Sequence, residues 1–167
     1  LLNELLDFSS LSSGRLPLVF DKVSLPALIK QVVQQLEPRG VRQSLKVKVK
    51  IDESIEEISA DYNRLKQVLI NLIDNALKFT PSGGLITVQL VRDKKEAVIT
   101  INDTGVGISD AELKLVKDKF YKGKSQAAGS GLGLAIVDEI IQAHHGLLSL
   151  TSKEGSGTTA EIRLPLN

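Results

Sequence analysis

The sequence has 167 residues, a formal net charge of +1, 42% hydrophobic and 25% charged residues, and no cysteine or methionine. The absence of cysteine excludes disulfides, thiol nucleophiles and cysteine-based zinc sites, and the near-zero net charge gives no electrostatic footprint for nucleic acid. The length suits one domain with a hydrophobic core. No apolar run is long enough to cross a bilayer, so we expect no direct membrane contact by this chain. Because it begins at Leu1 within an apolar helical pattern, we expect a piece of a longer protein.

The first sixty residues predict helices and a strand, each with one buried face. Leucines recur at helical spacing up to residue 8, and a serine- and glycine-rich stretch follows at 9–14. Ser24 is a suitable N-cap for a second helix, which the proline and glycine at 38–40 should end. Apolar residues alternate with lysines over 45–51, which predicts a strand with one solvated face.

The rest of the sequence predicts a fold of the α+β class. Asp61 is a suitable N-cap for a long helix that ends near residue 79. The further predicted elements, in chain order, are strands over 85–91 and 97–102, a short helix over 109–116, a loop over 117–130, a helix over 132–144, and strands over 147–152 and 158–164. This order predicts a mostly antiparallel sheet with helices layered on one face.

Three polar side chains lie along one edge of the apolar stripe of the helix that begins at Asp61. Asn71, Asn75 and Lys78 project together at the helical repeat. An amide oxygen can ligate magnesium, which keeps several waters and shares phosphate oxygens, and a lysine can neutralise phosphate charge. Taken alone, the pattern also fits solvated polar residues at the margin of a core.

A second motif, Asp103-x-Gly105-x-Gly107, follows a strand with a buried pattern. A carboxylate at this place can accept a hydrogen bond from an exocyclic amine such as that of adenine. The two glycines would let the backbone approach a flat ring closely. The alternative interpretation is a turn at the end of the strand, in which Asp103 binds its own backbone.

A third motif, Gly129-x-Gly131-x-Gly133, opens the helix predicted over 132–144. Free backbone N–H groups and the positive end of that helix form a seat for an anion. The two histidines at 144–145 end the same helix, and we interpret them as structural residues rather than phosphate acceptors or metal ligands. The three motifs together, in this order, indicate a site for ATP and Mg²⁺.

These motifs resemble those of bacterial sensor histidine kinases, and the resemblance covers nearly the whole chain. Residues 64–80 resemble the N box, 103–108 the first glycine box, 119–122 the F box and 129–146 the second glycine box, while 5–16 resemble the end of a second dimerisation helix. The resemblance implies two parts: residues 1–15, the end of that helix with a linker, and residues 16–167, a catalytic ATP-binding domain with a lid at 117–130.

The implied fold is a two-layer α/β sandwich of the GHKL type, with a mixed, mostly antiparallel sheet covered by helices on one face. The implied activity is transfer of the ATP γ-phosphoryl to a histidine, with Asp103 on the adenine amine and Asn75 on Mg²⁺. The residues implied in catalysis are Asn71, Lys78 and Lys122. Those implied in nucleotide binding are Asn71, Asn75, Lys78, Phe79, Asp103, Gly105, Gly107, Ile108, Gly129, Gly131, Leu132, Gly133 and Thr158.

The resemblance also implies partners that lie outside this chain. The acceptor histidine would be carried by a dimerisation domain of the parent protein, which would act as a homodimer and pass the phosphoryl to a response regulator. The implied location is cytoplasmic, in a parent that could itself be membrane-anchored.

Family members often carry arginine after the F-box aromatic, whereas this chain has Lys122, a point charge rather than a fork.

Three other functions share parts of this pattern. Gyrase and mismatch-repair ATPases hydrolyse ATP with a carboxylate base at the first N-box position, where this chain has Asn71. Serine-directed anti-sigma kinases share the fold, but the remnant of a dimerisation helix favours histidine. A non-catalytic module that senses or docks through nucleotide is the third alternative, and intact Asn75 and Asp103 argue against it.

Overall fold

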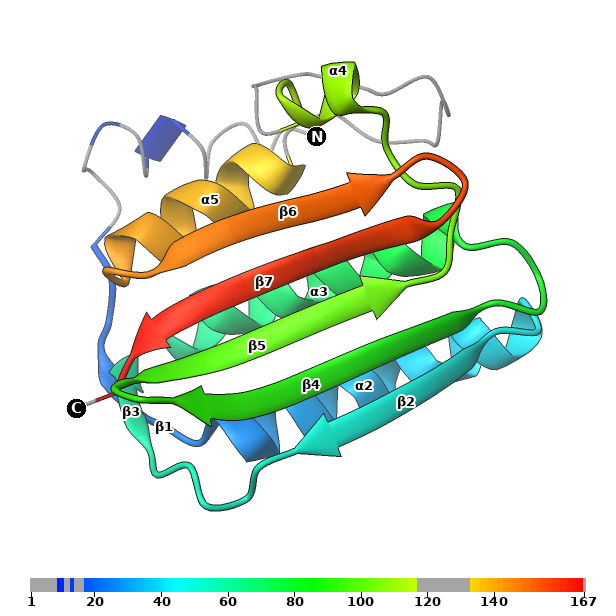
Figure 1. Ribbon diagram of the computed structural model, residues 1–167. Helices are drawn as coiled ribbons and strands as arrows, with labels where there is room; N and C mark the ends of the chain where they lie inside the picture. The colour runs from blue at the N-terminus through cyan, green and yellow to red at the C-terminus, as the bar shows by residue number, and fades with distance from the viewer. Residues whose placement is uncertain (1–8, 11–12, 14–16, 117–132, 167) are drawn as a thin grey trace.

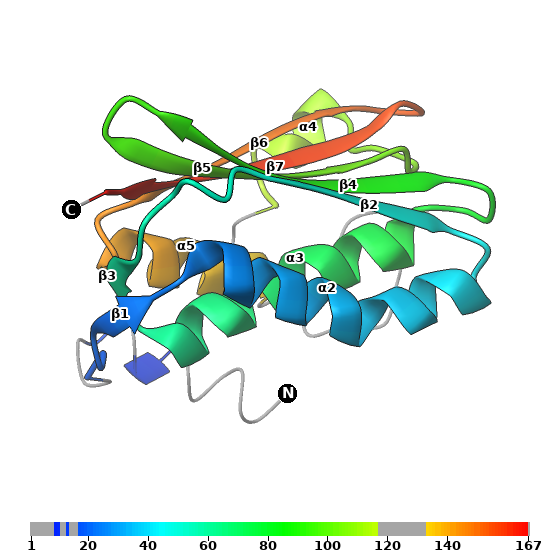
Figure 2. The same cartoon turned by 90° about the horizontal axis from the view of Figure 1, so that it is seen from below.

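A five-stranded sheet and a layer of helices form the computed structural model, which describes residues 9–10, 13, 17–116 and 133–166 (Figure 2). In chain order its elements are β1 (Asp21–Val23), α2 (Leu25–Arg42), β2 (Lys46–Ile51), β3 (Ile58–Ala60), α3 (Tyr62–Phe79), β4 (Leu85–Asp93), β5 (Glu96–Asp103), α4 (Asp110–Leu113), α5 (Gly133–Ala143), β6 (Leu147–Lys153) and β7 (Gly157–Pro165). The α+β class predicted from the sequence is confirmed.

The large sheet has the strand order β2-β4-β5-β7-β6, with β2 and β6 at its edges (Figure 1). Only the pair β2–β4 is parallel; the other three pairs in this sheet are antiparallel. The register of β5 against β7 sets Asp103 opposite Thr158. The mixed, mostly antiparallel sheet predicted above is therefore confirmed, and it brings together two residues that lie 55 positions apart.

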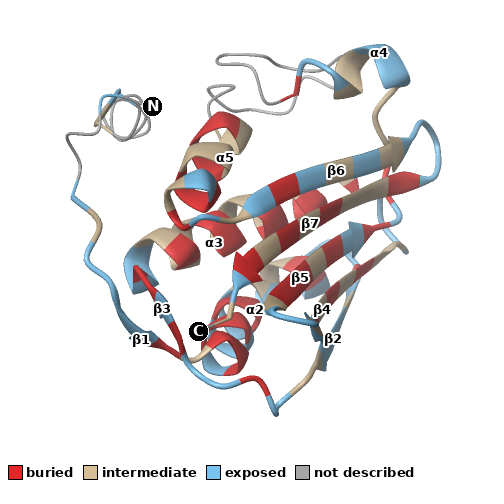
Figure 3. Ribbon diagram, turned by 60° about the vertical axis from the view of Figure 1, so that its left-hand side comes forward, coloured by how far each residue is buried: buried red, intermediate tan, exposed pale blue. Residues whose placement is uncertain are grey.

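The hydrophobic core lies between the sheet and the helices α2, α3 and α5 (Figure 3). α3 is the middle helix and packs against both α2 and α5. The N-caps predicted for α2 and α3 are confirmed: Ser24 Oγ accepts from the N–H of Ala27 at 3.3 Å, and Asp61 Oδ1 accepts from that of Arg64 at 3.1 Å. Each cap satisfies a backbone donor that the first helical turn leaves without an intrahelical partner.

The predicted end of α2 at 38–40 is wrong, because the helix continues to Arg42 with Pro38 inside it. Proline lacks an N–H group and removes one hydrogen bond from the helix, a loss that packing of the helix face can offset. Gly40 serves close packing: a Cβ there would lie 3.3 Å from atoms of both Leu77 and Val47. The glycine thus lets α2 approach both α3 and the edge strand β2.

Two smaller differences concern short elements. Residues 16–23 were expected to be extended, and β1 lies within them. The strand β3 and its pairing with β1, with Asp21 opposite Ala60, were not predicted, since three residues carry too little alternation to be recognised. The helix predicted over 109–116 is limited to α4, Asp110–Leu113. The helix predicted before residue 9 lies outside the described residues, although Ser9 and Ser10 are helical. Among the described helices, none combines the length and hydropathy that a membrane span needs.

Asp61 and His144 join the two ends of α3 and α5 that lie far from the glycine motifs. His144 is buried, its Nε2 accepts from the backbone N–H of Asp61 at 3.0 Å, and its Nδ1 lies 2.7 Å from the carbonyl of Ile140. The ring therefore donates through Nδ1 and accepts through Nε2. Asp61 Oδ2 accepts from the N–H of Val19 at 2.9 Å, and the Phe20 ring lies 5.2 Å from the imidazole. The structural interpretation of His144 is confirmed.

We expect His144→Ala to lower the free energy of unfolding by about 2–4 kcal/mol, because it leaves the N–H of Asp61 unpaired and opens a cavity. His145→Asn is the matched control, since His145 is exposed and its positive φ of 59° suits asparagine. The control should stay within about 0.5 kcal/mol of the parent. Urea unfolding of the three proteins measures both values, and equal stability of His144→Ala and the parent would contradict the assigned hydrogen bonds.

Candidate functional site

Several of the elements that carry predicted nucleotide residues end at the same side of the molecule. The C-terminal ends of α3, β5 and β6 and the N-terminal end of α5 lie at the same end of the molecule, opposite β1 and β3 (Figure 1). This arrangement brings Asp103, at the end of β5, toward Phe79, at the end of α3, and toward Thr158 in β7. Four predicted site residues, Lys122, Gly129, Gly131 and Leu132, lie outside the described residues, as does the predicted lid at 117–130.

The Asp103 carboxyl is buried and uses one of its two oxygens within the protein. Oδ1 accepts from the backbone N–H of Gly105 at 2.8 Å and from that of Thr158 at 3.2 Å. Oδ2 accepts no hydrogen bond from any described residue. Both interpretations of this motif therefore apply: Oδ1 binds the local backbone, while Oδ2 is an acceptor that a ligand donor can use.

Burial raises the pKa of Asp103, and the hydrogen bonds from Gly105 and Thr158 oppose that rise. Loss of water around the carboxyl disfavours its charged form, whereas two N–H donors favour it. A ligand that donates a hydrogen bond to Oδ2 would add a third donor and stabilise the charged form further.

The loop after Asp103 is held by backbone hydrogen bonds from two directions. The N–H of Val106 donates to the carbonyl of Phe79 at 3.1 Å, and the carbonyl of Val106 accepts from the N–H of Gly155 at 2.7 Å. A Cβ at Gly105 would lie 2.4 Å from the Phe79 carbonyl oxygen, so only glycine fits there. Gly107 has a φ of 70°, which glycine adopts without strain. The loop is therefore preorganised between α3 and the β6–β7 turn.

The polar N-box side chains lie on α3, outside the set of residues that this helix buries in the core. Asn71 and Asn75 are half-buried, and neither side-chain amide makes a hydrogen bond to another described residue. Lys78 Nζ lies 3.1 Å from Asp74 Oδ2, and Arg39 of α2 pairs with the same carboxylate. Asp74 was not predicted to take part, although its spacing of four residues from Lys78 on one helix is a recognisable signal.

Gly133 begins α5 at the same end of the molecule. A Cβ at Gly133 would have no described atom within 4 Å, so close packing does not require glycine at this position. The N–H groups of the first turn and the helix dipole favour negative charge there. The anion seat stays a prediction, since its other glycines lie outside the described residues.

A metal held by the protein alone does not fit the described residues, because no three His, Cys, Asp or Glu side chains among them form a cluster. Magnesium in nucleotide sites needs fewer protein ligands, since it binds one or two protein oxygens and takes its other ligands from phosphates and water. The amide of Asn75 can supply such an oxygen. The residues present therefore fit a magnesium ion that enters with a nucleotide.

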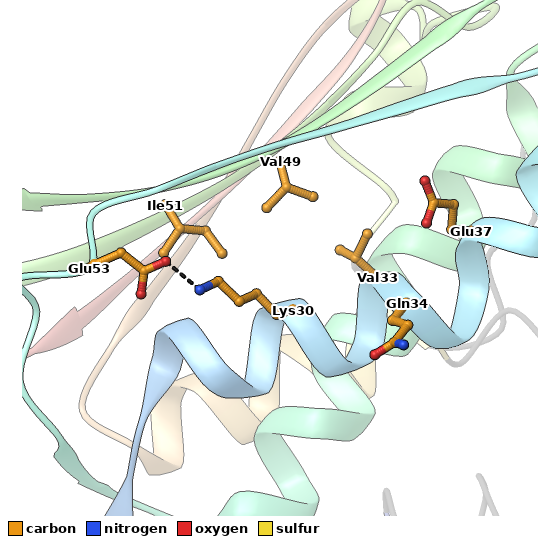
Figure 4. A pocket seen from close by; sticks show the side chains of 7 residues that line it. All are labelled: Lys30, Val33, Gln34, Glu37, Val49, Ile51 and Glu53. Carbon is orange, nitrogen blue, oxygen red and sulfur yellow. Dashed lines mark hydrogen bonds and ion pairs between the residues drawn. The ribbon is translucent and has the colours of Figure 1, made fainter.

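A hollow of about 330 Å³ lies elsewhere, between α2 and the edge strand β2 (Figure 4). Its lining residues are Lys30, Val33, Gln34, Glu37, Val49, Ile51 and Glu53. Lys30 pairs with Glu53 across it, so the one lysine in this lining is already neutralised by a carboxylate. None of the site residues predicted from the sequence lines this hollow. The hollow also lacks the hydrogen-bond acceptor and the glycines expected of a nucleotide site.

The family model of the histidine kinase-, DNA gyrase B- and HSP90-like ATPases matches residues 60–167. The non-motile and phage-resistance protein of Caulobacter vibrioides is 36% identical over 99% of this chain and 20% of its own length. The circadian input-output histidine kinase CikA of Synechococcus elongatus is 30% identical over 99% of this chain and 23% of its own. The chain thus spans about a fifth of the length of these two curated relatives.

Among solved structures, full-length ShkA in complex with AMPPNP is similar over 98% of this chain and 34% of the ShkA chain, with a TM-score of 0.87 and 27% sequence identity. A TM-score of this size over nearly every residue extends the likeness from the glycine motifs to the whole two-layer arrangement. The similarity includes residues before 60, which the family model does not match.

Proposed function

This chain belongs to the histidine kinase-, DNA gyrase B- and HSP90-like ATPase family, and we propose that it is the ATP-binding catalytic domain of a two-component sensor histidine kinase. The observation that carries the proposal is the Asp103 carboxyl, with one oxygen fixed by the protein and the other open to a donor. The relation to the histidine kinase CikA and to ShkA, whose structure contains AMPPNP, supports it.

In this proposal Asp103 Oδ2 accepts a hydrogen bond from the adenine amine, and the loop from Gly105 to Ile108 forms one wall of the base pocket. Phe79 packs near the nucleoside and Thr158 completes the polar contacts of the base. Lys78 reaches phosphate oxygens from its position beside Asp74. The N-terminal end of α5, with Gly133 and the glycines before it, receives the phosphates.

Asn75 would hold Mg²⁺ through its amide oxygen, and the ion would neutralise charge on the phosphates when bound. Asn71 would orient the γ-phosphate or the attacking imidazole, and Lys122 would contribute positive charge from the lid. An unprotonated imidazole nitrogen then attacks the γ-phosphorus: the N–P bond forms, the bond from phosphorus to the bridging oxygen breaks, and ADP leaves. The chain contributes mainly positioning and charge neutralisation.

The proposal extends to parts of the protein beyond this domain. Residues 1–15 would be the end of the second dimerisation helix with its linker, and residues 16–167 the catalytic domain, with a lid at 117–130. The apolar side chains within residues 1–15 favour pairing with a partner helix and thus a homodimer of the parent protein. The histidine-bearing dimerisation domain and a response regulator would be the macromolecular partners, in the cytoplasm.

ATP hydrolysis is the second candidate activity, since gyrase-type ATPases share the family. It is disfavoured because Asn71 stands where those enzymes need a carboxylate base. The base pocket is tested by isothermal calorimetry with ATP and GTP in the presence of Mg²⁺. An acceptor at Oδ2 favours the amine of adenine over the carbonyl of guanine, so we expect GTP to bind at least about tenfold more weakly. Equal affinities would contradict the assignment of Asp103.

A further inference from the structure

Ser152, near the end of β6, joins three segments around the base pocket. Its hydroxyl accepts from the backbone N–H of Ile108 at 2.8 Å and donates to the carbonyl of Gly157 at 2.9 Å. The same oxygen lies 2.7 Å from Thr158 Oγ1. One half-buried hydroxyl therefore connects the far end of the Asp103 loop, the β6–β7 turn and the residue that faces Asp103 across the sheet.

The number of hydrogens fixes the direction of these bonds. A serine hydroxyl has one hydrogen and two acceptor positions. Because Ser152 donates its hydrogen to Gly157, the Thr158 hydroxyl must be the donor in the contact between the two side chains. Thr158 then has no hydrogen left and presents only acceptor positions to other groups.

The two ends of the Asp103 loop are held by different groups. At its start, Asp103 Oδ1 binds the N–H groups of Gly105 and Thr158. At its end, the N–H of Ile108 is held by Ser152 alone among the described side chains. Removal of the Ser152 hydroxyl would thus release the end of the loop and free the Thr158 hydrogen at the same time.

We propose that Ser152 is a positioning residue for base recognition, which fixes the loop at Ile108 and makes Thr158 a hydrogen-bond acceptor. The inference rests on the proposed ATP site and deepens it. Two acceptors, Asp103 Oδ2 and Thr158 Oγ1, then face the pocket, and both favour a purine with an amino group at position 6. Selectivity for such a base would depend on a serine that does not touch it.

The test compares Ser152→Thr, which keeps the hydroxyl, with Ser152→Val, which replaces it by a methyl group of similar volume. Calorimetry gives the affinities for ATP and for ITP, which has a carbonyl in place of the amine. We expect Ser152→Thr to stay within about twofold of the parent and Ser152→Val to bind ATP about tenfold more weakly. The preference for ATP over ITP should fall by about threefold or more in Ser152→Val, because the Thr158 hydroxyl can now donate to a carbonyl.

Ser149→Ala is the matched control, since Ser149 is an exposed hydroxyl on the same strand. Ser152→Ala, followed by urea unfolding, serves if the valine variant does not fold. Unchanged ATP affinity, or an equal loss for ATP and ITP, would overturn the inference and leave Ser152 a purely structural residue. If the parent itself shows no preference for ATP over ITP, the failure lies in the proposed base pocket, which removes the basis of the inference as well.

Discussion

Replacing Asp103 by asparagine is expected to weaken ATP binding about 100-fold, because a charge-assisted acceptor becomes a donor facing another donor. The asparagine oxygen can still accept the two hydrogen bonds that Oδ1 now accepts from the N–H groups of Gly105 and Thr158. Its NH₂ group then takes the place of Oδ2 and meets the adenine amine. Calorimetric titration with ATP and Mg²⁺ measures the loss.

The fold should survive this change, because the hydrogen bonds to Oδ1 remain possible and the burial of a charge is removed. Urea unfolding of Asp103→Asn should therefore give a free energy no lower than that of the parent by more than about 1 kcal/mol. Asp93→Asn is a matched control at the opposite end of the β4–β5 pair, where the carboxylate binds Arg163. Wild-type affinity in Asp103→Asn would contradict the adenine assignment.

The raised pKa of Asp103 adds a pH control with opposite signs for stability and binding. The pKa of Asp103 in the folded protein lies above 3.8, the ordinary pKa of an aspartate. The protonated Asp103 carboxyl therefore contributes to folding stability below pH 3.8, and this contribution is lost as the pH rises through the folded pKa. ATP needs the ionised carboxylate, so affinity should rise through the same window. In Asp103→Asn both changes should be absent. Parallel changes of stability and affinity in the parent would contradict this account.

Asn71→Asp is expected to reduce phosphoryl transfer about 100-fold while ATP affinity changes by no more than about threefold. The introduced carboxylate lies near the proposed γ-phosphate and attacking imidazole, where it repels the phosphate and misorients the acceptor. It leaves the base pocket around Asp103 untouched. Single-turnover transfer to a histidine-bearing domain of the parent protein, with calorimetry in parallel, separates the two effects.

The matched control is Asn63→Asp, which makes the same chemical change at an exposed position in the first turn of α3. A carboxylate there suits the helix dipole, so transfer and binding should both match those of the parent. A release of inorganic phosphate from Asn71→Asp would agree with the role of a carboxylate at this position in the hydrolysing relatives. Equal losses of transfer and affinity would instead place Asn71 in uniform substrate binding.

The signals that could be read from the sequence are local. The helix α3 was predicted nearly to the residue, because its apolar stripe, its cap at Asp61 and the turn after Phe79 all lie in one continuous segment. The strands β4 to β7 were predicted for the same reason. The Asp103 motif was recognised because a carboxylate and two glycines follow a buried strand directly.

The features that were missed depend on packing between distant segments. Ser152 lies 44 positions from Ile108, and only the sheet register brings the two together. α2 continues past Pro38 because its packing with α3 and β2 outweighs one lost hydrogen bond. No propensity or spacing rule contains either fact. The roles assigned to Asn71, Asn75 and Lys122 remain predictions.

Transfer of labelled phosphoryl to histidine tests the central claim most directly. This chain would be mixed with γ-labelled ATP, Mg²⁺ and the separately prepared histidine-bearing dimerisation domain of its parent protein. We predict acid-labile label on that domain, abolished by Asp103→Asn and by Asn75→Ala, since a phosphorus–nitrogen bond to imidazole hydrolyses readily in acid. Tight ATP binding without label on the dimerisation domain would contradict the assignment as a histidine kinase and favour a nucleotide-sensing module.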